Sequence, residues 1–99
     1  MTALSFANET GFPAQSRFLD GHFPGNPVVP GAVILAYLTR CLAAKEIQIT
    51  RIERMKFQRP LLPDQPFSID IARNGANAKV QFQDGQGAFA VARVVLSDR

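Results

Sequence analysis

The segment from Gly31 to Lys45 constrains the fold more than any other, because it is apolar on nearly every side. Its larger apolar residues recur three or four positions apart, which predicts a helix. Alanine and leucine fill most of the remaining positions, and the polar residues gather near the C-terminal end. A helix of this kind is buried on most of its sides. We therefore expect it to lie against a sheet, with a partner covering whatever the sheet leaves open.

The other regular segments show the alternation of β-strands. Ile47 to Phe57 predicts one long strand, and Ile52 falls out of phase within it, which indicates a β-bulge near the middle. Further strands are predicted at Leu4 to Asn8, Arg17 to Asp20, Phe67 to Ala72, around Val80 to Phe82, and Phe89 to Leu96, with a hairpin turn at Asp84 to Gly87. Small residues in the last strand, Ala88, Ala90 and Ala92, leave room for a helix to lie close. The sum is α+β, one helix on one antiparallel sheet.

Length and composition limit the function. The chain has 99 residues, enough for a single domain over residues 1–99, and its core is thin enough to favour a partner subunit. The N-terminus lacks the pattern of a signal peptide, and no apolar run is long enough to span a membrane. The only cysteine, Cys41, predicts a reduced, cytoplasmic protein. With one histidine and one cysteine far apart, neither metal nor other cofactor is expected. A net charge of +3 without an arginine-rich arm argues against nucleic acid.

The loop from Gly21 to Gly31 is the least generic part of the sequence. It has three prolines and three glycines in eleven residues, so it is a rigid, turn-rich connection. It holds the only histidine, His22, and ends where the predicted helix begins and free backbone N–H groups collect. A histidine there can take a proton from the carbon next to a carbonyl, while the Gly31 amide stabilises the oxygen. A thioester suits this scheme.

The residues His22 to Gly31 read His-Phe-Pro-Gly-Asn-Pro-Val-Val-Pro-Gly. They resemble the His-Phe-Pro-Gly-x-Pro-x-x-Pro-Gly signature of the hotdog-fold 3-hydroxyacyl-acyl carrier protein dehydratases. The stretch from Ile52 to Leu62, followed by Pro63 and Asp64, is similar to a strand of the same family that ends in a basic-aromatic-basic-proline pattern. The resemblance implies a sheet wrapped around a central helix, normally in a dimer, with the acyl tunnel at the subunit interface.

The resemblance also implies roles for individual residues. His22 and the backbone amide of Gly31 are the expected catalytic groups. Basic residues after the helix are expected to dock an acidic acyl carrier protein, although a solvated strand face would explain them equally well. The expected substrate-binding residues are Phe23, Pro30, Ala36, Tyr37 and Arg40, and the expected docking residues are Arg54, Lys56 and Arg59.

Ala36 departs from the family pattern. The family supplies a second catalytic residue, Glu or Asp, fourteen residues after the motif histidine, and here that position is alanine, which cannot donate a proton. Three functions therefore remain open. The first is a dehydratase-like enzyme whose acid comes from water, Tyr37 or another chain. The second is a hotdog thioesterase in which His22 and Gly31 orient a thioester for attack by water. The third is a non-catalytic binder of acyl thioesters, such as one half of a heteromeric dehydratase.

Several of these residues also have plain structural interpretations. His22 could be a loop histidine satisfied by backbone groups, although the complete signature favours a functional role. Tyr37 is more often a core aromatic than an acid, and Arg40 more often a surface or interface charge. Cys41 lies on the apolar stripe, which predicts an unreactive buried thiol. The assembly expected is a homodimer or larger even homo-oligomer, or a heteromer with a second hotdog subunit.

Overall fold

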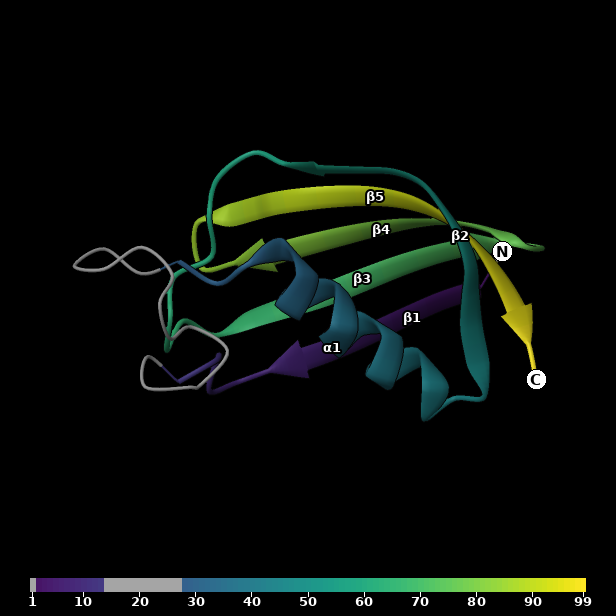
Figure 1. The fold of residues 1–99 in the computed structure, drawn as a ribbon, viewed down its shortest axis with the longest axis horizontal. Coiled ribbons are helices and arrows are strands. Elements are labelled where there is room, and N and C mark those ends of the chain that lie inside the picture. The colour runs from purple at the N-terminus through teal and green to yellow at the C-terminus, as the bar shows by residue number, and fades with distance from the viewer. Residues whose placement is uncertain (1, 14–27) are drawn as a thin grey trace.

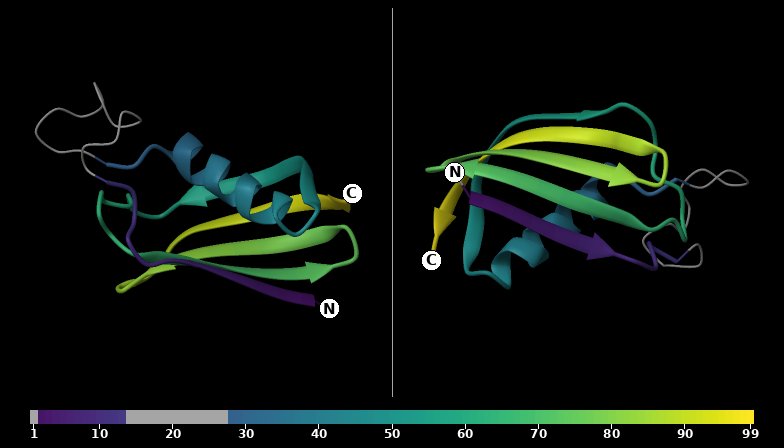
Figure 2. Two further views of the ribbon diagram at one scale, coloured as in Figure 1. Left: turned by 90° about the horizontal axis from the view of Figure 1, so that it is seen from below. Right: turned by 180° about the vertical axis from the view of Figure 1, so that it is seen from behind.

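The computed structural model describes residues 2–13 and 28–99. One helix lies along one face of a five-stranded antiparallel sheet whose strand order is β1-β3-β4-β5-β2 (Figure 1). Two further views show that the helix occupies only one side of the sheet (Figure 2). The predicted α+β architecture is confirmed. The elements are β1 (Thr2–Asn8), α1 (Gly31–Ala43), β2 (Ile47–Phe57), β3 (Phe67–Asn74), β4 (Asn77–Asp84) and β5 (Gly87–Asp98).

The helix α1 buries a single stripe against the sheet. Ile34, Leu38 and Leu42, spaced four residues apart, are almost completely buried. Truncating either leucine to alanine typically costs about 2–5 kcal/mol at such sites. Ala36 and its neighbours on the opposite face remain exposed, so the sheet alone does not cover this apolar helix.

The helix ends two residues earlier than the predicted Lys45. Ala43 is its last residue, and the backbone N–H groups of Lys45 and Glu46 bond to the carbonyls of Leu42 and Ala43 at 2.9 Å. Glu46 then adopts a left-handed conformation with φ of 61°. This reversal turns the chain directly into β2, and three residues separate the two elements.

The edge strand β2 contains two bulges. Against β5, its register shifts between Ile49 and Arg51 and again between Ile52 and Arg54. Thr50 and Glu53 are therefore extra residues on β2, and the strand bends around the end of the sheet (Figure 1). The predicted bulge is confirmed, and it changes the side of the sheet that the following residues face. Ile52 pairs with the buried Val94, so it faces the helix side despite being out of phase in the sequence.

The core lies between α1 and the inner strands. Phe67, Ile69 and Ile71 of β3 are buried in the predicted alternation. A register shift opposite Gln83 places Phe89 and Ala90 of β5 both in the core, which alternation alone does not predict. The other core residues of the three inner strands are Ala78, Val80, Phe82, Ala92, Val94 and Leu96.

Of the two remaining predicted strands, the structure describes one and not the other. The strand from Leu4 to Asn8 is confirmed and begins two residues earlier, at Thr2. The candidate strand from Arg17 to Asp20 lies outside the described residues. Within residues 2–13 and 28–99, no helix has the length and apolar character needed to cross a membrane.

Candidate functional site

The N-terminus of α1 is the part of the candidate site that the structure describes. Pro30 is extended, with ψ of 143°, and its carbonyl accepts hydrogen bonds from Val33 N at 3.0 Å and Ile34 N at 3.3 Å. No side chain of the described residues caps this end, and its first turn carries no acidic residue. Within residues 2–13 and 28–99, the first backbone N–H groups of the helix therefore have no side-chain acceptor, and such groups can bind an oxygen atom of a ligand.

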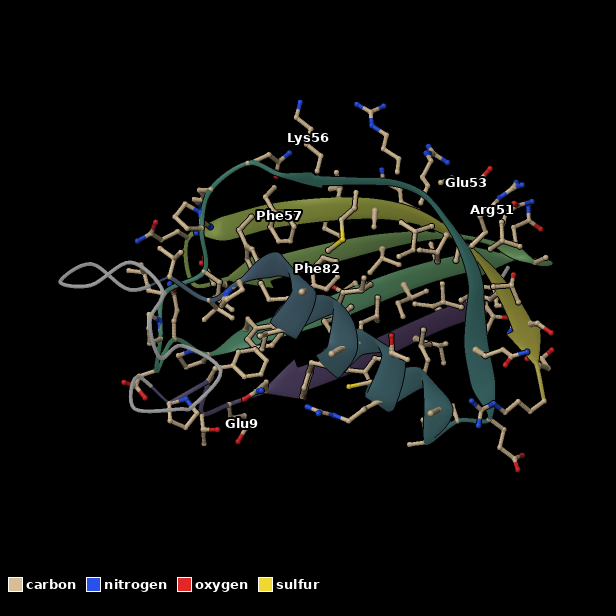
Figure 3. The ribbon with its side chains drawn as sticks, viewed as in Figure 1. Glu9, Arg51, Glu53, Lys56, Phe57 and Phe82 are labelled. Carbon is tan, nitrogen blue, oxygen red and sulfur yellow. The ribbon has the colours of Figure 1, made fainter. Side chains whose placement is uncertain are left out.

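Phe57 lies directly against Gly31. A Cβ on Gly31 would lie 2.9 Å from Cε2 of this ring, closer than a real Cβ approaches any neighbour. The ring is 40% exposed even though it lies on the helix side of the sheet (Figure 3). Together these two residues border an open hollow of about 420 Å³, lined by Val28 to Gly31 and by Phe57 to Leu61. Glycine at position 31 therefore makes room for an aromatic wall beside the helix N-terminus.

An ion pair fixes the end of β2 that forms this hollow. Arg59 donates to both carboxylate oxygens of Asp84, at 2.5 and 2.6 Å, and to the carbonyl of Gly87 at 2.9 Å. The Asp84 side chain is fully buried, and hydrogen bonds from Arg59 hold the pKa of its carboxyl below the ordinary value. Two residues further on, the Leu61 carbonyl accepts from Val29 N at 2.9 Å. The pair thus braces the wall opposite the helix N-terminus.

Arg59 was expected to dock a carrier protein, and the structure gives its charge another partner. The guanidinium lies in the bidentate pair with Asp84 and 5.9 Å from the Phe89 ring centroid. The same pair raises the pKa of Arg59. A guanidinium held in this way has few donors left for an incoming protein, so its described contacts fit a structural role.

Ala36 and Arg40 line a second, smaller hollow on α1. It has a volume of about 220 Å³, and its other lining residues are Phe12, Ala32 and Val33. Both Ala36 and Arg40 are exposed. The described part of the chain therefore offers an apolar recess where the helix carboxylate of the family is missing.

Tyr37 packs among aromatic rings. Its centroid lies 5.7 Å from that of Phe12 and 5.5 Å from that of Phe67, both edge to face, and Arg40 lies 6.0 Å over its ring. Burial raises the pKa of Tyr37 above its ordinary value of 10.0, and a hydrogen bond with Cys41 raises it further. The phenol therefore stays protonated at neutral pH. Cys41, expected to be buried, is half-buried.

Arg54 and Lys56 lie on the face of the sheet away from α1. Figure 3 shows Lys56 extending outward past β2, away from α1, and it alternates with Met55 and Phe57, which pair with the buried Ala92 and Ala90. Both residues line a hollow of about 320 Å³, which Lys79 and Arg93 also line. Neither Lys79 nor Arg93 was singled out in the sequence, because only the strand register brings them beside β2.

The structure brings the expected residues together in part. Pro30 lies with Gly31, Ala36 with Arg40, and Arg54 with Lys56. His22 and Phe23 lie outside the described residues. Phe57 and Asp84 were missed as site residues, although Phe57 had two sequence signals, its place in the strand alternation and the aromatic position of the basic-aromatic-basic-proline pattern. In the described ranges, no group of three His, Cys, Asp or Glu side chains could hold a metal ion.

Comparison with known proteins agrees with this geometry. A family model described as ApeI-like, ApeI dehydratase, matches residues 3–93. The 3-hydroxyacyl-acyl-carrier-protein dehydratase FabZ of Acetivibrio thermocellus is 36% identical over 63 residues, covering 54% of this chain and 43% of that protein. The chain therefore spans less than half the length of this curated relative.

Solved structures show the same fold. The dehydratase heterocomplex ApeI:P from Xenorhabdus doucetiae matches with a TM-score of 0.79 at 20% identity, over 98% of this chain and 88% of that one. An acyl-CoA hydrolase from Staphylococcus aureus matches with a TM-score of 0.65 at 12% identity, over 97% and 65% of the two chains. These likenesses confirm the predicted hotdog fold.

Proposed function

From the premise that this chain belongs to the ApeI-like dehydratase family, we propose that it is a hotdog subunit of a 3-hydroxyacyl thioester dehydratase. The observation that carries the proposal is the N-terminus of α1, which begins at Gly31, the last residue of the family motif, and which no side chain of the described residues caps. His22 supplies the base, and the Gly31 amide stabilises the thioester oxygen. The Phe57 wall keeps water from one side of that oxygen.

The reaction needs one base and one acid. His22 removes a proton from C2 of the 3-hydroxyacyl thioester, and negative charge moves onto the thioester oxygen, where the helix N-terminus stabilises it. The C3–O bond then breaks as the leaving hydroxyl takes a proton, giving water and a trans-2-enoyl thioester. In this chain, no helix carboxylate exists at position 36 to give that second proton.

We propose that a second hotdog subunit supplies the acid. Ala36 is exposed in the recess it shares with Phe12 and Arg40, so a side chain from another subunit can enter there. The similar structure from Xenorhabdus doucetiae is a dehydratase heterocomplex, which supports a heteromeric assembly. A homodimer or larger even homo-oligomer, with water or Tyr37 as the acid, is the alternative assembly.

The substrate is proposed to arrive on an acyl carrier protein in the cytoplasm. The curated relative is a 3-hydroxyacyl-acyl-carrier-protein dehydratase, which supports this carrier. The only cysteine of the sequence, Cys41, has no partner within the chain for a disulfide, which suits a reducing compartment. Fatty acid synthesis and the related polyketide and aryl polyene pathways are the proposed settings.

A hotdog thioesterase is the second candidate. The absence of a carboxylate at Ala36 favours it, because hydrolysis of the thioester by water needs no acid on a leaving hydroxyl at C3. A non-catalytic acyl-thioester subunit is the third.

One assay separates these functions. The purified protein is incubated with 3-hydroxyacyl and trans-2-enoyl thioesters, and the products are followed by mass spectrometry while free thiol is measured in the same tube. Interconversion without thiol release supports the dehydratase. Thiol release would assign a thioesterase. No change in either measurement fits a chain that needs a second hotdog subunit for its acid, and it also fits a subunit that binds without catalysis, so the Ala36→Glu variant is needed to separate these two.

Two variants extend the assay. Ala36→Glu restores a carboxylate at the family position, and we expect it to raise dehydration by the isolated chain at least 10-fold. His22→Ala should abolish that gain while leaving the fold intact. If His22→Ala leaves turnover unchanged, the proposed base is wrong.

A further inference from the structure

Residues 58–61 follow β2 and are held by the hairpin that joins β4 to β5. The pairing of β2 with β5 ends at Phe57. Beyond it, Gln58 N and Arg59 N both donate to the carbonyl of Phe89, at 2.8 and 3.4 Å. Contacts with the hairpin therefore take over from the strand ladder in fixing where this segment runs.

The Arg59 side chain adds a directional hold on the same segment. Its two terminal nitrogens donate to the two carboxylate oxygens of Asp84, and one of them also donates to the Gly87 carbonyl. A planar fork on two oxygens fixes orientation as well as distance, which a single hydrogen bond does not. The Asp84 side chain is fully buried, so water does not compete for its carboxylate.

One backbone hydrogen bond links this segment to the start of the helix. Val29 N donates to Leu61 O at 2.9 Å, and both side chains are buried in the core. Among the described residues, it is the only backbone hydrogen bond from residues 28–30 to a segment other than α1. Pro30 and Gly31 follow directly, so the location of the first helical amide depends on where Leu61 is held.

Stability alone is a weak reason for burying the Arg59–Asp84 pair. Taking a carboxylate out of water is costly, and replacing a buried ion pair by apolar residues often leaves a protein equally stable. A second bidentate pair, Arg73 with Asp98, has the same chemistry in a more exposed place. The two pairs lie at opposite ends of β5, which begins at Gly87 and ends at Asp98. Only the first pair holds the segment that reaches the helix start.

The benefit of such a hold is geometric. A group that stabilises developing charge has to lie within about 0.5 Å of its productive place, and an error of about 1 Å can cost about 100-fold in rate. The Phe57 ring limits movement of Gly31 on one side, because even a Cβ there would lie 2.9 Å from it. The bond from Val29 to Leu61 limits movement of the segment just before it.

We propose that Asp84 is a positioning residue for the Gly31 amide, acting through Arg59 and Leu61. Its part in turnover rests on the proposed function, whereas the path of contacts from Asp84 to Val29 does not. Asp84 holds Arg59, and Arg59 holds the segment that ends at Leu61. The Leu61 carbonyl then holds Val29, two residues before the amide. The residue that places the site for the thioester oxygen thus comes from the β4–β5 hairpin and not from the family motif.

The first test measures this path and needs no substrate. Amide hydrogen exchange of the full chain is followed by NMR at Val29. Asp84→Asn should speed this exchange about 5-fold, because opening the bond to Leu61 no longer has to break an ion pair. Arg59→Lys keeps the charge but loses the planar fork, so it should have the same effect. Asp98→Asn is the matched control and should leave Val29 unchanged. Unchanged exchange at Val29 in either of the first two variants overturns the proposal.

The second test measures positioning during the reaction. Turnover is compared in the Ala36→Glu background, where the isolated chain is expected to dehydrate its substrate. Asp84→Asn and Arg59→Lys should each lower kcat about 10-fold and keep KM within about 2-fold, since a displaced amide weakens charge stabilisation in the transition state. Asp98→Asn should change neither constant. An equal fall of kcat in Asp98→Asn, or a rise of KM at unchanged kcat in Asp84→Asn, overturns the positioning role.

The two tests separate this inference from the proposed function. Faster exchange at Val29 without turnover in any background would remove the dehydratase and leave Asp84 as the residue that positions the start of α1. Turnover that depends on His22 but not on Asp84 would keep the dehydratase and overturn the positioning role.

Discussion

Gly31 illustrates how one residue can serve packing and chemistry at once. Its amide lies at the start of α1, where the thioester oxygen is proposed to bind, and its missing side chain leaves space for Phe57. A substitution that keeps the amide but fills the space can separate the two roles. The Phe57 ring can move by rotation about its side-chain bonds. The backbone N–H of Gly31 is fixed by the helix, and no other group at this position can replace it.

Gly31→Ala should reduce turnover about 10-fold, because its Cβ would approach Phe57 to 2.9 Å and displace the ring or the helix end. Adding Phe57→Leu should restore most of the loss, since the smaller side chain removes the clash while the amide is unchanged. Steady-state rates of the single and double variants measure this. Phe57→Leu alone is the control, and full activity of Gly31→Ala would contradict the tight contact.

Tyr37→Phe should keep turnover within about 2-fold, because the ring packs on Phe12 and Phe67 and its hydroxyl is not needed for that packing. Loss of its hydrogen bond with Cys41 should lower the free energy of unfolding by less than about 1 kcal/mol. Rates and denaturant unfolding measure both effects. A 100-fold drop in turnover with normal stability would identify Tyr37 as the acid instead.

At the scale of elements, the end of β2 depends on the hairpin between β4 and β5. Arg59 reaches the buried Asp84 at the end of β4, and Gln58 N donates to the Phe89 carbonyl at 2.8 Å. Asp84 Oδ1 also accepts from Gln86 N at 2.8 Å, which shapes the hairpin turn. The wall of the candidate site is thus supported from a hairpin more than twenty residues away in sequence.

The Arg59–Asp84 pair should make the free energy of unfolding decrease as the pH falls into the acid range. Its hydrogen bonds lower the pKa of Asp84, so this contribution is complete above the ordinary value of 3.8 and is lost as the pH falls through the lower folded value. Asp84→Asn should cost about 1 kcal/mol at pH 7, a figure kept small because Arg59 remains partly in water. Urea unfolding at pH 7 and pH 3 should show the difference from the unmodified chain shrinking at low pH.

Asp98→Asn is the control for this experiment. Arg73 lowers the pKa of Asp98 in the same way, but the Asp98 side chain is 70% exposed, so its substitution should have the smaller effect at pH 7. An Asp84→Asn cost that is unchanged between pH 7 and pH 3 would show that the ion pair adds no acid-dependent stability.

At the scale of the whole molecule, the apolar surface left open lies along β2 and α1. Ile52 and Phe57 are 42% and 40% exposed although both lie on the helix side of the sheet. Ala32 and Ala36 are exposed on the helix. A large apolar residue on an edge strand is a common place for a second subunit to bind. This open surface supports the proposed assembly with another hotdog chain.

Ile52→Asp should therefore weaken the assembly at least 10-fold, because it would place a charge in the interface. Within the isolated chain its effect should be small, since Ile52 is already largely in water. Size-exclusion chromatography with light scattering across a concentration series measures the change. Gln48→Asp, exposed on the same strand, is the control, and an unchanged assembly state in Ile52→Asp would place the interface elsewhere.

Local patterns in the sequence predicted the elements but not their long-range contacts. The spacing of Ile34, Leu38 and Leu42 was sufficient for the buried helix face, and Ile52 for the bulge in β2. The pair of Arg59 with Asp84 joins residues 25 positions apart, so it depends on tertiary structure. The nearness of Lys79 and Arg93 to Arg54 similarly depends on the register of three strands. The alternation of apolar and polar residues in the sequence also did not predict the bulge in β5 that buries both Phe89 and Ala90.

The two bulges of β2 also bear on how the chain behaves when crowded. An unpaired edge strand can template fibrils, in which identical strands add without limit. Thr50 and Glu53 divide the ladder of β2 into runs of three, two and four paired residues, so a straight foreign strand cannot follow it. Only a strand with matching irregularities can pair along the whole edge. The bend therefore keeps this edge open to the proposed second subunit while it hinders pairing with unrelated strands.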